Sequence, residues 1–182
     1  ANDSSHGFDV TRDMAAGAVT TLRLSVLRAP RYPDPLTDLG VHHHSYALAL
    51  GVDELGATEL GQRLNSRTRT LTGAAGVEPL VSVSGDGVLL DAVKLAEDRS
   101  GDLIVRVHEA RGRLASAKIA LDASAATVAS VEEVSLLEEA VSAAAGSGAA
   151  MLPGDAAAHV ADGRVSVKLT PFSVRTFRFR LA

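Results

Sequence analysis

Three consecutive histidines, His42, His43 and His44, are the residues of this chain whose type best suits metal chemistry. In an extended strand His42 and His44 lie on one face, so both imidazoles can reach the same ion. A complete site needs a third and a fourth ligand, and Asp34 and Asp38 are candidates. The alternative is structural: His44 shares its face with the apolar residues that follow and fills a core position. Two histidines without a full ligand set favour the structural hypothesis.

Asp34 and Asp38 also flank a proline-containing turn and could form a pair of carboxylates. Two carboxyl groups at the right separation are the acid and base of glycoside hydrolysis. Aspartates in Pro/Gly loops more commonly accept hydrogen bonds from backbone N–H groups and so cap turns. Asp38, two residues before Gly40, suits this second role, which the pattern favours.

A charged turn contains Lys94, Glu97 and Asp98. It is either an ion-paired turn or a sugar-contacting cluster, and we favour the first because surface ion pairs are common. We expect Arg106 and Glu109 to be charges on an exposed strand face.

Composition limits the function classes. Hydrophobic residues make up 46% of the 182 residues, and this predicts a folded core. The net charge of −4, with both signs interspersed, predicts no binding to nucleic acid or to an anionic membrane. No apolar run reaches the roughly 20 residues of a membrane span. The absence of cysteine fits a reducing compartment, so we expect a cytoplasmic location.

The dominant hydrophobic period is two, which indicates strands with one buried and one solvated face. It is clear in residues 20–26, 103–108, 165–169 and 176–181. Gly- and Asp-rich turns separate these segments. The pattern predicts an all-β fold with an antiparallel β-sandwich.

Two segments break the strand pattern. Residues 52–64 predict a poor helix at best, because Gly56 and Gly61 interrupt them. Residues 139–159 predict a long loop with at most one helical turn. The polar stretch 65–79 predicts a domain boundary, which we place between residues 76 and 77.

Four blocks of sequence resemble the non-catalytic C-terminal region of glycoside hydrolase family 38, the α-mannosidases. The most specific is 27–50, with Ala29-Pro30, Pro33-Asp34, Asp38-Leu39-Gly40-Val41-His42 and Tyr46-Ala47-Leu48. The others are 2–10, 92–109 and 171–176. In the first of these, Ser5 and His6 depart from the Lys and Tyr that are usual in the family.

The resemblance implies that residues 1–76 are the end of a β-supersandwich and that 77–182 are a terminal β-sandwich domain. It implies a non-catalytic part of an α-mannosidase that supports an N-terminal catalytic domain of the same polypeptide. That domain would carry the Zn²⁺ and act on the α-mannoside, so we expect no catalytic residue, metal or cofactor in this chain. Because the chain opens within a motif block, we expect it to be a fragment.

We expect pocket-facing residues, if any, on the loops, and the candidates are Asn2, Asp3, His6, Asp34, Asp38 and His42. The alternative is a stand-alone carbohydrate-binding or adhesion β-sandwich. An aromatic content of 3% without tryptophan disfavours it, because sugar rings stack on exposed aromatics.

We expect strands at residues 22–26 and 42–50, and their apolar faces need a cover. We expect a homodimer partner or the C-terminal residues to bury Leu24, Val26, Tyr46, Leu48 and Leu50.

Overall fold

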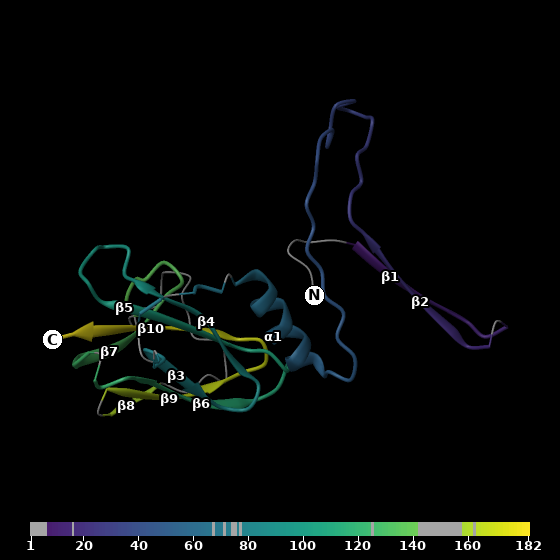
Figure 1. Cartoon of the computed structure of the whole chain (residues 1–182). Coiled ribbons are helices and arrows are strands. Elements are labelled where there is room, and N and C mark those ends of the chain that lie inside the picture. The colour runs from purple at the N-terminus through teal and green to yellow at the C-terminus, as the bar shows by residue number, and fades with distance from the viewer. Residues whose placement is uncertain are drawn as a thin grey trace. The chain divides into compact units, whose positions relative to one another are not determined.

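The computed structural model describes residues 7–15, 17–66, 68–70, 72–73, 76, 78–124, 126–141, 158–161 and 163–182. The chain divides into two units, Ala1–Thr70 and Leu71–Ala182 (Figure 1). Asn2, Asp3 and His6 lie outside the described residues, as does most of the predicted loop at 139–159. The assignment of 1–76 and 77–182 to two parts of a larger enzyme stays a prediction.

The first unit begins with an antiparallel hairpin of β1 (Gly7–Asp13) and β2 (Val19–Ser25). Asp9 stands opposite Arg23, and their side chains form an ion pair of 3.0 Å. Every residue of both strands is exposed, so the prediction of one buried face for 20–26 is wrong. The reason is that a two-stranded ribbon has no second layer to cover either face.

Helix α1 (Glu54–Asn65) also differs from the sequence prediction, because it is a regular helix of 12 residues. Asp53 caps its N-terminus and accepts a hydrogen bond of 2.9 Å from the Gly56 N–H. Glu54 in the first turn and Arg63 in the last have the signs that the helix dipole favours. The cap and these charges offset the roughly 1 kcal/mol that each interior glycine costs.

The segment between the hairpin and α1 forms no regular strand. Residues 42–50 were predicted as a strand, but only Tyr46 makes a single bridge. Alternating apolar residues become a strand only when a neighbouring strand supplies a hydrogen-bond ladder. The five side chains predicted to be covered are 36–87% exposed, and their covering by a partner stays a prediction.

The second unit is a two-layer β-sandwich (Figure 1), with eight strands among its described residues. One sheet has the order β4 (Val88–Leu95), β5 (Leu103–Glu109), β10 (Val174–Leu181) and β7 (Val128–Val134). The other has the order β3 (Val81–Ser84), β6 (Ala115–Leu121), β9 (Arg164–Leu169) and β8 (His159–Ala161). Every neighbouring pair of strands is antiparallel. The predicted all-β fold with an antiparallel sandwich is therefore confirmed.

The core lies between the two sheets and follows the period-two pattern. Val105 and Phe177 from one sheet, and Ile119 and Val165 from the other, have no exposed surface. The alternate residues point outward from each sheet, as an antiparallel sandwich requires. No helix in the part of the chain that the structure describes is long and apolar enough to cross a membrane.

Candidate docking site around Glu109

Glu109, the last residue of β5, is a carboxylate with no exposed surface. The sequence prediction that it lies on an exposed strand face is wrong. The reason is the alternation of side chains along β5, which places Glu109 on the same face as the core residues Leu103, Val105 and Val107. A charge at a core position needs partners, and the neighbouring turns supply them.

Four backbone N–H groups donate to the Glu109 carboxylate. The Arg111 N–H reaches Oε1 at 2.8 Å, and the N–H groups of Gly112, Arg113 and Phe172 reach Oε2 at 2.8, 3.2 and 3.0 Å. Burial of the carboxylate would raise its pKa, but the four donors outweigh burial and hold the pKa below its usual value. Glu109 is therefore ionised at neutral pH and joins the β5–β6 turn to the β9–β10 turn.

A third turn, between β3 and β4, closes the site. The Ala110 N–H donates to the Gly87 carbonyl at 2.8 Å. Gly87 has φ +79°, and a Cβ there would lie 3.3 Å from Glu109 Oε1, so glycine fits both its backbone and its neighbour. Asp86 of the same turn pairs with Arg111 at 3.3 Å and with Arg113. The three turns thus form one cross-linked end of the sandwich.

Phe172 is an exposed aromatic residue at this end of the sandwich. Its φ is +59°, in the left-handed region that costs a residue other than glycine roughly 1–2 kcal/mol. Its ring packs against Gly112, where an added Cβ would lie 2.6 Å from the ring, yet 72% of the residue is exposed. Leu114 and Val174, close by in the sequence, are exposed at 75% and 47%.

This arrangement suits binding rather than proton transfer. Both oxygens of Glu109 already accept backbone hydrogen bonds, and the carboxylate is closed to solvent. Its effect is to hold an aromatic ring in a strained, exposed position, and strain of this kind is concentrated at functional sites. Neither Glu109 nor Phe172 was among the residues selected from sequence.

The residues selected from sequence lie elsewhere, on the loop of the first unit. Asp34 Oδ1 accepts a hydrogen bond of 2.9 Å from the Leu36 N–H, which is the turn-capping role expected for such residues. Asp38 has φ +59°, and its carbonyl accepts a hydrogen bond of 2.9 Å from His42 Nε2. The His42 and His44 rings stack with centroids 6.0 Å apart.

The structure thus brings His42 to the Asp38 backbone, not to a carboxylate. Among the described residues, no group of three His, Asp or Glu side chains could hold a metal ion. In the second unit Lys94 pairs with Glu97 and, at 2.8 Å, with Glu138, so the predicted ion-paired turn is present.

Comparison with known proteins places the sandwich in a family. A profile described as "Glycosyl hydrolases family 38 C-terminal beta sandwich domain" matches residues 87–177, half of the chain. The match spans β4 to β10 and includes Glu109 and Phe172.

Three relatives carry the name α-mannosidase. "Alpha-mannosidase 2C1" of Mus musculus is 36% identical over 101 residues, which is 50% of this chain and 10% of that protein. Its human namesake is 34% identical over 124 residues, 60% of this chain and 12% of that protein. "Alpha-mannosidase" of Saccharomyces cerevisiae is 27% identical over 199 aligned positions, 97% of this chain and 17% of that protein. The chain thus spans less than a fifth of these relatives. Taken with the antiparallel sandwich, the profile match shows that the chain belongs to glycoside hydrolase family 38 and contains that family's C-terminal β-sandwich domain.

Proposed function

We propose that the chain is the non-catalytic C-terminal part of an α-mannosidase and that it supports the catalytic domain of the same polypeptide. The observation that carries this proposal is the family match over residues 87–177, which covers most of the sandwich. The names of the three relatives support the activity of the intact enzyme, the hydrolysis of α-mannosides. Zn²⁺ would then belong to the catalytic domain, and the cytoplasmic location stays a prediction.

The Glu109 end of the sandwich is the surface that we propose for contact with the catalytic domain. Phe172 is an exposed apolar residue whose ring is held in place against Gly112, so it is suited to anchor a protein contact. An aromatic residue in a well-packed setting is the kind of side chain that dominates binding energy at interfaces. The hydrogen bond to the buried Glu109 carboxylate holds Phe172 in its strained backbone conformation. This strain costs the isolated domain free energy, which binding to a partner would offset.

A stand-alone carbohydrate-binding module is the second candidate, since an exposed ring is also a platform for a sugar. The surroundings argue against it. Leu114 and Val174, exposed residues close by in the sequence, offer no hydrogen bond to a sugar hydroxyl, and the exposed Asp86 and Arg113 already pair with each other. Exposed apolar side chains instead fit an apolar protein surface.

Phe172→Asn tests the docking surface directly. Asparagine tolerates a left-handed backbone, so the variant keeps the turn and removes the ring. The polypeptide encoded upstream of Ala1 is expressed separately, and its affinity for the 182-residue chain is measured by titration calorimetry. We expect the variant to lower this affinity about tenfold or more.

Leu137→Asn is the matched control, because Leu137 is 81% exposed but lies on the loop after β7. We expect this control to bind like the unchanged chain. If Phe172→Asn binds as tightly as the unchanged chain, the Glu109 end of the sandwich is not the docking surface. Failure of the unchanged chain to bind the upstream polypeptide, or an upstream sequence with no catalytic domain, would overturn the proposed function itself.

A further inference from the structure

The outward face of the sheet β3-β6-β9-β8 has an unusual charge pattern. Its outward residues include the cations Lys118, Arg164 and Lys168, together with His159. The remaining outward positions of these four strands are serines and alanines, and no carboxylate is among them. The whole chain has a net charge of −4, so acidic residues are plentiful, yet none occupies an outward position of these four strands.

The positions of the lysines add to this uneven distribution of charge. The chain has only three lysines, and two of them, Lys118 and Lys168, are on this face. The third, Lys94, lies in the other sheet and pairs with Glu97 and Glu138. No ion pair of Lys118 or Lys168 occurs within the described part of the chain, and both side chains are exposed. Their charge is therefore available to a ligand.

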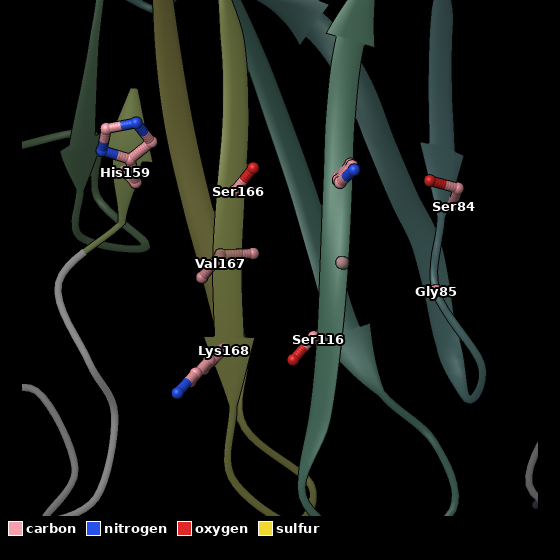
Figure 2. Close-up of a pocket in the computed structure, with 9 residues that line it drawn as sticks. Ser84, Gly85, Ser116, His159, Ser166, Val167 and Lys168 are labelled. Atoms are coloured by element: carbon pink, nitrogen blue, oxygen red, sulfur yellow. The ribbon is translucent and has the colours of Figure 1, made fainter. Parts of the chain in front are cut away.

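A shallow hollow lies beside Lys118 and Lys168. It has a volume of about 500 Å³, and its lining includes Ser84, Ser116 and Ser166. Figure 2 shows His159, Ser166, Ser116 and Ser84 on four successive strands, from β8 to β3. Serine side chains are short, so their hydroxyl groups lie below the longer lysines and His159, beside the apolar residues Ala117 and Val167.

Strand register brings these groups together. Ser84, Lys118, Ser166 and His159 are directly opposite one another across the four strands. Lys168 stands opposite Ser116 and is thus the diagonal neighbour of Lys118. Diagonal neighbours on one face of a sheet are about 7–8 Å apart, a span that two lysine side chains can close onto one anion.

We propose that this hollow is a binding site for a small phosphate-bearing anion. Two ammonium groups supply charge-assisted hydrogen bonds, and the serine hydroxyls donate to the remaining phosphate oxygens. A neutral sugar fits less well, because the described lining has no Phe, Tyr or Trp ring to stack on and no carboxylate to accept from sugar hydroxyls. The site is on the sandwich domain itself and is independent of the docking proposal.

The small number of lysines makes a direct test possible. Reductive ¹³C-methylation keeps the positive charge of lysine and gives one NMR signal for each of the three lysines, besides that of the methylated α-amino group. The methylated chain is titrated with inorganic phosphate at constant ionic strength, with chloride as the replaced anion. We expect saturable shifts of the Lys118 and Lys168 signals, with a dissociation constant on the order of 1 mM. Lys94 is the internal control and should not move.

Two variants extend the test. Lys118→Gln with Lys168→Gln should weaken phosphate binding about tenfold or more, measured from backbone amide shifts of β6 and β9. Ser166→Asp places a carboxylate in the hollow and should abolish the response, while a dispersed amide spectrum shows that the fold is kept. Equal or non-saturating shifts of all three lysines would show a bulk ionic effect and overturn the proposal. Unchanged phosphate binding by the double lysine variant would overturn it as well.

Discussion

Replacement of Glu109 by glutamine tests how the end of the sandwich is built. The carboxylate accepts four backbone hydrogen bonds of 2.8–3.2 Å in a fully buried position. Glutamine keeps one oxygen, which can accept the three N–H hydrogen bonds that Oε2 accepts in the unchanged chain. Its NH₂ group would then face the Arg111 N–H, which becomes an unsatisfied buried donor.

The expected loss of unfolding free energy follows from these contacts. An unsatisfied buried donor costs about 1–3 kcal/mol, and each bond that changes from charged to neutral loses about 1 kcal/mol. Glutamine avoids the cost of burying a charge, which offsets part of the loss. We therefore expect Glu109→Gln to lower the free energy of unfolding by about 2–4 kcal/mol.

Urea unfolding of the 182-residue chain, followed by the backbone amide signals of β5 and β10, measures this difference. Glu132→Gln is the matched control, because Glu132 makes an exposed ion pair of 2.6 Å with Arg180. The control should cost less than about 1 kcal/mol. If Glu109→Gln costs no more than Glu132→Gln, the carboxylate does not hold the turns and the argument for Phe172 fails.

Three further predictions follow from the same structure. Hydrogen bonds from Ser100 and Arg178 lower the pKa of Asp98 to about 2, and the pKa values of Asp102, Glu109 and Glu138 are also lowered in the folded state. Carboxyl groups in the unfolded chain have pKa values near 4. The four ionised carboxylates should therefore stabilise the fold fully above about pH 5 and progressively less as the pH falls towards 2. Urea midpoints that stay constant over this range would contradict this prediction. The 182-residue chain should not hydrolyse p-nitrophenyl α-mannoside with or without Zn²⁺, and zinc-dependent turnover that disappears in His42→Ala would overturn this. Residues 77–182 should fold alone while 1–76 should not, and a well-dispersed NMR spectrum of 1–76 would move the boundary.

The sandwich could be predicted from the sequence because its signal is local. Alternation in 103–108 and 176–181 places Val105 and Phe177 in the core, and both are fully buried. The same alternation already assigned Glu109 to the core side of β5. It was overlooked because a charged residue was assumed to lie outside, an assumption that fails when backbone donors surround the carboxylate.

Other features depend on information that the sequence does not display. The exposed hairpin and residues 42–50 show alternation, but burial needs a second layer, which no local pattern specifies. The stability of the helix at 54–65 was underestimated, because the cost of its glycines was considered and the stabilising Asp53 cap was not. Phe172 has no local signal for its left-handed backbone, because that backbone is held by Glu109, which is 63 residues away in the chain.

The most direct test of the central claim is an activity measurement on two separate polypeptides. The region encoded upstream of Ala1 is expressed without residues 1–182, and its hydrolysis of p-nitrophenyl α-mannoside is followed during incubation at rising temperature. We predict that addition of the 182-residue chain, which is inactive alone, preserves this activity, and that the Phe172→Asn chain does so less well. Turnover by the 182-residue chain alone, or an upstream activity that is equally durable with and without it, would contradict the account.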